Sequence, residues 1–289
     1  MEIQPFDATL GASITDVKLD LNLNKATFKK IEEALYKYGV IVFPKQYLSD
    51  DEHIAFSRRF GPLEPLGYQN HSANVSYKEI GMISNVKPDG TLWPRQSEEG
   101  LFLKGNTGWH TDSSFKQYPA KASILAAHKV PTQGGGTEFA DMRAAYDALK
   151  PSMRNWLEGK LAVHSFIYSQ GLIGGLPVLT KEEAVALVPV KHPIVSIHPK
   201  TGRKSLYIGR HASHIEGINE QEGREVLQKL CEDSCQSPRV FTHCWDAGDI
   251  VMWDNRCVLH RGQTWPEDQA RVMARTTVSQ DDFKEIEGN

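Results

Sequence analysis

The sequence predicts a mainly β fold with flanking helices, either a sandwich or a jelly-roll barrel. Short strand-like runs follow one another along most of the chain, with turn residues between them. A regular alternation of strand and helix, which would predict a doubly wound parallel sheet, is missing. The chain has 289 residues, of which 40% are hydrophobic, and it contains no repeats or linkers. We therefore expect a single domain over residues 1–289.

The first 60 residues predict two strands and two helices. Ser49 followed by Glu52 forms a capping box, which marks the start of a helix. Apolar residues at helical spacing before Gly39 indicate an earlier, amphipathic helix. In order, we expect an edge strand and turn within 11–17, a helix over 25–37, a buried strand over 40–43 and a helix over 49–59.

Residues 61–105 differ from the segments on either side of them. They are rich in Gly, Pro, Asn and Ser and show little periodicity. Long irregular segments in compact domains are usually binding loops or active-site lids. Because this segment leads directly to His110, we expect it to form a lid over the active site.

The rest of the chain predicts mostly strands with three helices among them. Thr180 with Glu183 forms a second capping box, which marks the start of the middle helix. The expected helices cover 142–149, 181–187 and 220–231. The expected strands cover 122–130, 137–139, 161–166, 194–198, 205–208, 240–245, 249–253 and 275–279.

A candidate metal site begins at His110 and Asp112. In an extended segment, residues two apart point to the same face, so both side chains can reach one ion. The best candidate for a third ligand is His260, and two histidines with one carboxylate form the facial triad of non-haem Fe(II) oxygenases. A chain with 11 histidines also contains this spacing by chance, so a hydrogen-bonded pair at a strand end is the alternative.

Two arginines follow the third candidate ligand. An iron oxygenase that uses a dicarboxylate such as 2-oxoglutarate needs a cation for the end of that molecule that does not bind iron. The planar guanidinium of arginine bonds a carboxylate with two parallel hydrogen bonds. Arg271 and Arg275 are four residues apart, which places them on one face of a strand, and one could hold the co-substrate and the other an anionic substrate. Exposed ion pairs are the alternative interpretation.

Other motifs carry less information. The run from Gly134 to Thr137 lacks the Lys and the following helix of a phosphate loop, so we interpret it as a turn that presents Thr137. His211 and His214 have no third ligand nearby in the sequence, and we expect structural or pocket-lining roles for them. No Gly-x-Ser-x-Gly motif is present to suggest a serine hydrolase.

The overall composition excludes several classes of function. A net charge of −3 and a pI near 6.4 give no general attraction to nucleic acid or to an anionic membrane. No signal peptide and no apolar stretch of the length of a membrane span is found. The four cysteines show no Cys-x-x-Cys spacing and indicate reduced thiols. We expect a cytoplasmic protein.

The motifs together resemble the TauD/TfdA family, whose members are Fe(II)- and 2-oxoglutarate-dependent dioxygenases. The resemblance extends from about Gly11 to Asp281 and is closest to the branch that cleaves aryloxyacetates. It rests on Trp109–Asp112, Gly134–Phe139, Trp253–Asn255, His260–Arg261, Arg271 and Arg275, and also on the segments 139–149, 211–217 and 252–262.

The family resemblance implies a fold and a set of ligands. The fold would be a double-stranded β-helix, which is a cupin-like jelly roll. His110, Asp112 and His260 would bind Fe(II), and O2 would be the oxidant. Thr137 and Arg271 would hold 2-oxoglutarate. The resemblance also implies that the substrate contacts Arg275, Asn106 and His211.

The resemblance also implies a reaction on a small organic anion. 2-Oxoglutarate would be converted to succinate and CO2 while the substrate is hydroxylated. An aryloxyacetate-like carboxylate would then yield a phenol and glyoxylate by ether cleavage. The alternatives are a sulfonate, an alkyl sulfate or an amino-acid-derived substrate, and, in another class, a zinc protein or a non-catalytic metal- or small-molecule-binding protein. Relatives of this kind imply a homo-oligomer.

Overall fold

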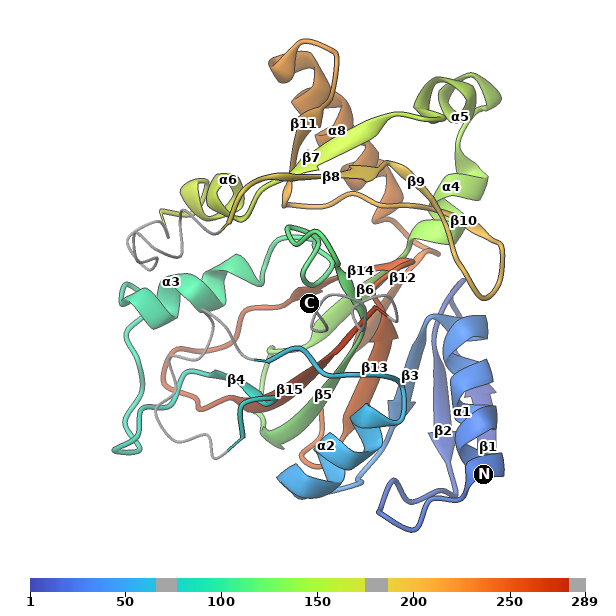
Figure 1. The fold of residues 1–289 in the computed structure, drawn as a ribbon. Coiled ribbons are helices and arrows are strands. Elements are labelled where there is room, and N and C mark those ends of the chain that lie inside the picture. Colours follow the sequence, from blue (N-terminus) through green and yellow to red (C-terminus); the bar gives the residue numbers. More distant parts are fainter. Residues whose placement is uncertain (66–76, 175–186, 281–289) are drawn as a thin grey trace, which may run out of the picture.

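The computed structural model describes residues 1–65, 77–174 and 187–280, and its centre is an open seven-stranded sheet (Figure 1). All neighbouring strands pair antiparallel except β2 and β3, which are parallel. The strand order is β1 (Glu2–Pro5), β2 (Ala12–Thr15), β3 (Val40–Phe43), β13 (Ile250–Asp254), β5 (Ala120–Lys129), β15 (Val272–Ser279) and β4 (Gly81–Ser84).

Three smaller sheets complete the β structure. The first has the order β12 (Val240–His243), β6 (Thr137–Asp141) and β14 (Val258–Gly262). The second has the order β11 (Ala212–Ile215), β7 (Leu161–His164) and β8 (Val190–Pro193). The third pairs β9 (Val195–Ile197) with β10 (Lys204–Leu206).

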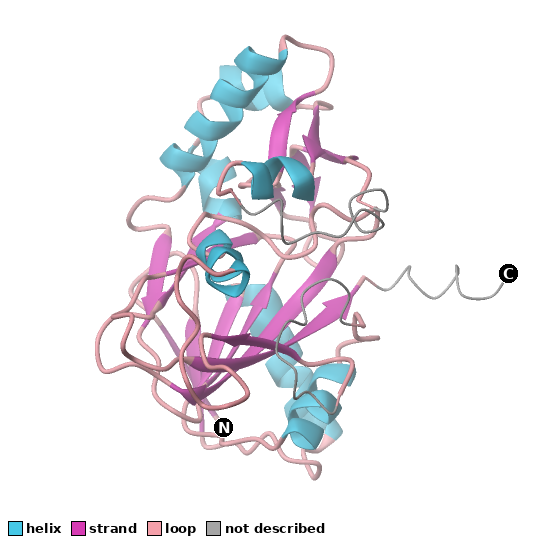
Figure 2. Cartoon of the chain, turned by 90° about the vertical axis from the view of Figure 1, so that its left-hand side faces the viewer, coloured by secondary structure: helices cyan, strands magenta, loops and turns pink. Residues whose placement is uncertain are grey.

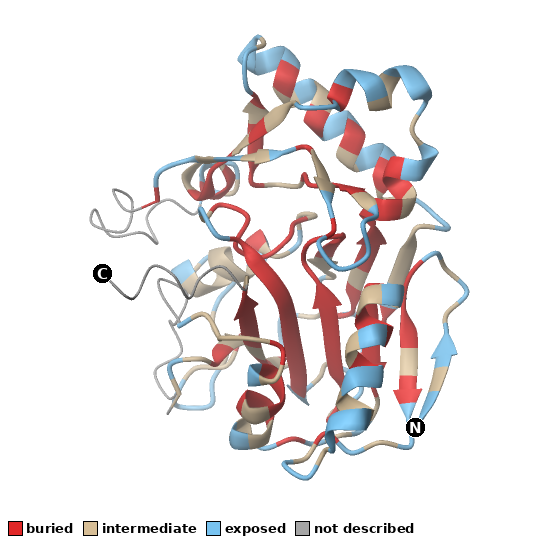
Figure 3. Cartoon of the chain, turned by 45° about the vertical axis from the view of Figure 1, so that its right-hand side comes forward, coloured by how far each residue is buried: buried red, intermediate tan, exposed pale blue. Residues whose placement is uncertain are grey.

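The central strands of the large sheet are buried on both faces (Figure 3). In β5, Ile124 and Ala126 belong to one apolar cluster, whereas Leu125 and Ala127 belong to another. Successive side chains of a strand point to opposite faces, so a continuous apolar run fills the space on both sides. The second cluster also contains Phe139 of β6, and it therefore lies between the large sheet and the β12–β6–β14 sheet.

Helices cover the outer surfaces at opposite ends of the molecule (Figures 1 and 2). At one end, α1 (Lys25–Tyr38) and α2 (Asp50–Arg58) pack on the large sheet. At the other end lie α4 (Met142–Ala148), α5 (Pro151–Leu157) and α8 (Glu220–Ser234), while α3 (Glu98–Gly105) and α6 (Phe166–Gly171) lie between the two ends. None of the helices in the described ranges is long and apolar enough to cross a bilayer.

The helix ends follow the sequence signals. The capping box of Ser49 and Glu52 is present at the start of α2. Gly39 ends α1 with a positive φ of 76°, a conformation that glycine adopts without steric cost. Most predicted strands and helices are confirmed to within a few residues. The expected helix over 181–187 and its capping box lie almost entirely outside the described residues.

Several predictions are wrong. The strand in 11–17 is not at the edge, because β1 pairs with its outer side. Residues 61–105 are not wholly irregular, because they contain β4 and α3. The predicted strand over 161–166 ends at His164, since Ser165 caps α6 and Phe166 begins that helix. The sequence patterns also did not indicate β8, β11, β14 and α5.

Candidate active site

The three candidate metal ligands meet where the chain from α3 reaches β14. His110 and His260 face each other in an isolated antiparallel bridge, in which each backbone N–H donates to the other carbonyl at 3.0 and 2.8 Å. Asp112 lies two residues after His110. Its carboxylate oxygens lie 3.9 Å from Nε2 of His110 and 3.7 Å from Nε2 of His260. One ligand atom from each of the three buried residues lies within 4.8 Å of the others.

The protonation states suit metal binding. Nδ1 of His110 lies 2.8 Å from the carbonyl oxygen of Gly108, to which it donates, so Nε2 keeps its lone pair. Burial lowers the pKa of His260 to about 4, and burial together with His260 holds the pKa of His110 well below its ordinary value. Burial raises the pKa of Asp112. Arg275, followed by His260 and His110, lowers that pKa by a larger amount, so the net shift is downward. Two neutral imidazoles and one carboxylate are the donor set that suits Fe(II).

The imidazole of His260 is oriented by packing and not by a hydrogen bond. Its Nδ1 atom is buried and has no hydrogen-bond partner among the described residues. The ring instead lies against Trp253, with the ring centroids 4.6 Å apart. It also lies over Phe139 of β6 at 6.3 Å. The orientation of this imidazole therefore depends on the aromatic core between the two sheets.

Arg275 on β15 reaches the same carboxylate. Its Nη1 atom lies 2.8 Å from Oδ1 of Asp112, and its side chain is 14% exposed. It lines a pocket next to the metal ligands. The other predicted substrate residues, Asn106 at the end of α3 and His211, line that pocket too. Phe102, Phe115 and Phe166 supply aromatic rings.

His211 is a neutral hydrogen-bonding group. Ser169 donates to the carbonyl of Phe166 at 2.8 Å, so its oxygen accepts from Nδ1 of His211, also at 2.8 Å. Nε2 of His211 is then an acceptor. Burial, followed by the charge of Arg210, holds the pKa of His211 well below its ordinary value. His214 bonds to Ser213 and is not among the residues that line the pocket.

Arg271 and Thr137 are not among the residues that line this pocket. Arg271 precedes β15, is 5% exposed, and donates from Nε to the carbonyl of Gly135 at 3.1 Å. None of the described residues forms an ion pair with it, and burial lowers its pKa to about 10. Thr137 starts β6 after a turn with two positive-φ glycines, and its Oγ1 accepts from Trp245 at 2.9 Å, which leaves its hydroxyl proton to donate elsewhere. A buried cation without a counterion and a nearby hydroxyl donor fit the carboxylate of a 2-oxoglutarate molecule.

Three polar residues that contact this region were not predicted from the sequence. Ser123 and Asn255 bond to Asp112, and Arg210 lines the pocket while bonding the carbonyls of Gly105 and Ser169. A serine within a strongly apolar strand was the available signal for Ser123. Arg210 gave no local signal, because its partners come from two distant helices.

Comparisons with known proteins agree with this geometry. The sequence profile of the family described as "Taurine catabolism dioxygenase TauD, TfdA family" matches residues 2–277. An (S)-phenoxypropionate/alpha-ketoglutarate-dioxygenase of Sphingobium herbicidovorans is 42% identical, over 98% of this chain and 96% of that protein. An alpha-ketoglutarate-dependent 2,4-dichlorophenoxyacetate dioxygenase of Cupriavidus pinatubonensis is 41% identical, over 96% and 97%.

A solved structure is also similar. AAD-2 in complex with Mn(II) and N-oxalylglycine superposes with a TM-score of 0.88 at 37% identity, over 96% of this chain and 98% of that chain. This similarity extends over nearly the whole chain and confirms the predicted jelly-roll fold. The chain therefore belongs to the TauD/TfdA family and is an Fe(II)- and 2-oxoglutarate-dependent dioxygenase that acts on a small molecule.

Proposed function

We propose that this enzyme hydroxylates an aryloxyalkanoate-type carboxylate at the carbon attached to its ether oxygen. The observation that carries the proposal is the position of Arg275, which brings a guanidinium into an aromatic-lined pocket, 2.8 Å from Asp112. An anionic group held there would place the adjacent carbon beside the metal ligands. Phe102, Phe115 and Phe166 would surround the aryl ring. The similarity to two dioxygenases named for phenoxypropionate and 2,4-dichlorophenoxyacetate supports the same substrate class.

In this proposal each residue has a separate task. His110, Asp112 and His260 would hold Fe(II), and Arg271 with Thr137 would hold the carboxylate of 2-oxoglutarate that is remote from the metal. Bound iron with 2-oxoglutarate and O2 would supply the oxidation. 2-Oxoglutarate would become succinate and CO2, with one oxygen atom of O2 entering succinate and the other entering the substrate.

The residues of the pocket would place the substrate. Arg275 would orient the anion so that one C–H bond faces the metal. The amide of Asn106 would donate a hydrogen bond to a remaining oxygen, while the neutral imidazole of His211 would contact the substrate without adding a charge. The pocket encloses only about 40 Å³, room for a few water molecules, so the substrate must displace part of its lining. The hydroxylated carbon would carry both a hydroxyl and the ether oxygen. Loss of the aryloxy group from that carbon gives a phenol and the corresponding 2-oxo acid, which is glyoxylate when the substrate is an aryloxyacetate.

A sulfate ester is the second candidate substrate. Arg275 would bond a sulfate as well as a carboxylate, because both anions present two oxygens to a planar guanidinium. An alkylsulfatase of Acinetobacter baylyi is 29% identical over 96% of this chain and 85% of that protein. The lower identity and the aromatic lining favour the aryloxyalkanoate.

The first experiment measures succinate and phenol in parallel. Enzyme with Fe(II), ascorbate and 2-oxoglutarate is assayed with 2,4-dichlorophenoxyacetate, with an alkyl sulfate, and without substrate. We expect succinate to rise with the aryloxyacetate and to match the phenol released. Stimulation by the alkyl sulfate alone would move the proposal to the second candidate. Succinate unaffected by either compound would refute both substrate assignments.

We also infer the setting of the enzyme. The four cysteines are free thiols, which supports a reducing compartment such as the cytoplasm. We propose a homo-oligomer of single-domain subunits in which residues 61–105, of which 66–76 lie outside the described residues, form a cover over the active site. Met82 and Phe102, which line the pocket, support this cover. Light scattering after size-exclusion chromatography measures the subunit number, and a monomer at working concentration would refute the oligomer.

A further inference from the structure

A chain of hydrogen bonds reaches Oδ2 of Asp112, whereas Arg275 bonds Oδ1. Ser123 of β5 is fully buried, and its Oγ lies 2.6 Å from Oδ2 of Asp112. Nδ2 of Asn255 lies 2.9 Å from the same Oγ. An amide nitrogen can only donate, so the single proton of Ser123 is left for the carboxylate. The direction of the chain is therefore fixed, from Asn255 through Ser123 to Asp112.

The amide of Asn255 is fixed in orientation by obligate donors. Its Oδ1 accepts from the backbone N–H of Asp112 at 3.2 Å and from Nε1 of Trp253 at 3.0 Å. The hydroxyl of Thr111 lies 3.1 Å from the same oxygen. Turning the amide over would place two N–H donors of the protein against an NH2 group, so this side chain has one stable orientation.

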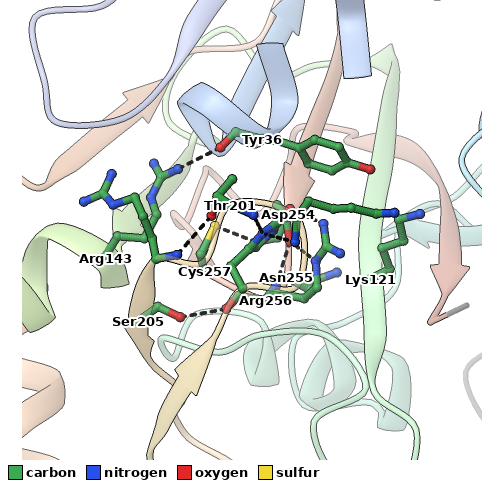
Figure 4. A network of polar contacts seen from close by, with 12 residues as sticks. Tyr36, Lys121, Arg143, Thr201, Ser205, Asp254, Asn255, Arg256 and Cys257 are labelled. Atoms are coloured by element: carbon green, nitrogen blue, oxygen red, sulfur yellow. Dashed lines mark hydrogen bonds and ion pairs between the residues drawn. The ribbon is translucent and has the colours of Figure 1, made fainter. Parts of the chain in front are cut away.

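A network of polar contacts surrounds the turn that carries Asn255 (Figure 4). Oδ1 of Asp254 accepts from Nε of Arg256 at 2.8 Å, and Oδ2 accepts from Nη2 at 2.6 Å. Nε2 of His198 lies 2.9 Å from the same Oδ2. The backbone N–H of Asn255 donates to the carbonyl of Lys121 at 3.0 Å, which ties the turn to β5. A buried network of charges thus holds the turn and so fixes the starting point of the hydrogen-bond chain.

We propose that Ser123 and Asn255 are a positioning pair that fixes the orientation of the Asp112 carboxylate and thereby sets the affinity of the site for a divalent metal. This inference rests on the metal-binding role proposed above for Asp112. A carboxylate on a rotatable side chain would otherwise be oriented by Arg275 alone. Hydrogen-bond partners of metal ligands commonly change metal affinity by about 10- to 100-fold.

The pair also explains how Arg275 can serve two anions. Its guanidinium bonds Oδ1 of Asp112 and also lines the substrate pocket, so a bound anion competes with Asp112 for the same cation. Ser123 bonds the other oxygen and is not exposed, so no substrate can reach it. Asp112 therefore keeps its orientation when the bonds of Arg275 are shared.

The test measures metal binding directly, without turnover. Mn(II) chloride is titrated into metal-free full-length protein by calorimetry, and urea unfolding is followed separately. We expect Ser123→Ala to bind Mn(II) about 10- to 100-fold more weakly than the unaltered protein. Ser123→Thr restores the hydroxyl and is expected to recover the affinity to within about threefold.

Ser57→Ala is the matched control. Ser57 of α2 is equally buried; its hydroxyl donates to the carbonyl of His53 at 2.8 Å and lies 2.6 Å from Oγ1 of Thr276, so its loss removes buried hydrogen bonds that lead neither to Asp112 nor to the turn of Asn255. We expect Ser57→Ala to lose similar stability but to bind Mn(II) normally. If Ser123→Ala does not fold, Ser123→Cys takes its place with the same expectation, because a thiol donates only weakly.

The outcomes separate this inference from the proposed metal site. Equal Mn(II) affinities of the two alanine variants, or no recovery in Ser123→Thr, would overturn the positioning pair and leave the metal site intact. Failure of the unaltered protein to bind Mn(II) would overturn the proposed ligands themselves.

Discussion

Replacing Arg271 by methionine should weaken 2-oxoglutarate binding and, at the same time, stabilise the ligand-free protein. The guanidinium is 5% exposed and forms no ion pair among the described residues. Burial lowers its pKa from 12.5 to about 10, which corresponds to roughly 3 kcal/mol of destabilisation of the charged side chain. Methionine keeps the apolar stem and removes the charge.

The net change in stability follows from what is lost with the guanidinium. The hydrogen bond to Gly135 contributes about 1 kcal/mol, and the contact with the Trp265 ring, 5.2 Å from centroid to Arg271 Cζ, contributes about 0.5–1 kcal/mol. We therefore expect the metal-free Arg271→Met protein to be more stable by about 1–2 kcal/mol. Loss of one member of a buried charged hydrogen-bond pair costs about 2–5 kcal/mol of binding, so the Kd for 2-oxoglutarate should rise at least about 30-fold.

Arg143→Met is the matched comparison. Arg143 is as buried as Arg271, but it bonds Asp141 at 2.8 Å through Nε. The same substitution removes the ion-pair partner of the buried Asp141 carboxylate, which keeps the backbone N–H donors of Arg143 and Ala144, and should cost about 3–5 kcal/mol. Urea unfolding of metal-free protein measures both stabilities. Anaerobic calorimetry with Mn(II)-loaded protein measures 2-oxoglutarate binding. A loss of stability in Arg271→Met, or a Kd within about threefold of the unaltered value, would refute the reasoning.

Three further predictions follow from other residues. Arg275→Gln should raise the KM for the primary substrate at least about tenfold with less than about threefold effect on that for 2-oxoglutarate; equal effects in steady-state kinetics would contradict the assigned roles. Burial lowers the pKa of His164 from 6.5 to about 3. Between pH 6.5 and about pH 3 the unfolded chain binds a proton at His164 that the native protein does not bind, so the free energy of unfolding falls as the pH falls. His164→Gln should therefore remove about 2 kcal/mol of the stability loss between pH 7 and pH 5, measured by urea unfolding of metal-free protein, and an unchanged loss would contradict it. Gly134→Ala places a Cβ 2.4 Å from the carbonyl oxygen of Thr264 at a φ of +69°. Gly159 has a similar φ of +73°, but a Cβ there meets no atom within 4 Å. In urea unfolding, Gly134→Ala should therefore cost about 1–3 kcal/mol more than Gly159→Ala, and equal losses would contradict the steric argument.

The parts of the fold that local chemistry specifies could be predicted from the sequence. The capping box of Ser49 and the glycine at position 39 fix helix ends through groups only a few residues away. By contrast, α3 carries Leu101, Phe102 and Leu103 in succession, which gives no helical period, so its formation depends on contacts with distant parts of the chain. The edge strand β1 is short and mostly exposed, so its residues carry no apolar alternation.

The site divides in a similar way. The spacing of His110 and Asp112 and the pair of arginines are visible in the sequence because each lies within a few residues on one segment. Ser123 and Asn255 have no such spacing, and their role depends on the register of β13 against β5, in which Trp253 faces Ser123. The bond of Arg275 to Asp112 likewise depends on the pairing of β15 with β5 and could not be derived from residue types.

The reciprocal backbone bridge between His110 and His260 has a consequence for how the enzyme is made. The two residues are 150 positions apart (260 − 110). During synthesis His110 emerges long before its partner, so all three candidate ligands can meet only after the intervening residues have been translated and the sheets have closed. Contacts of this sequence separation form late and slowly, because loop-closure entropy opposes them. Bound iron would therefore stabilise only chains in which β14 has been made and has paired, because chains that are truncated or stalled before β14 lack His260.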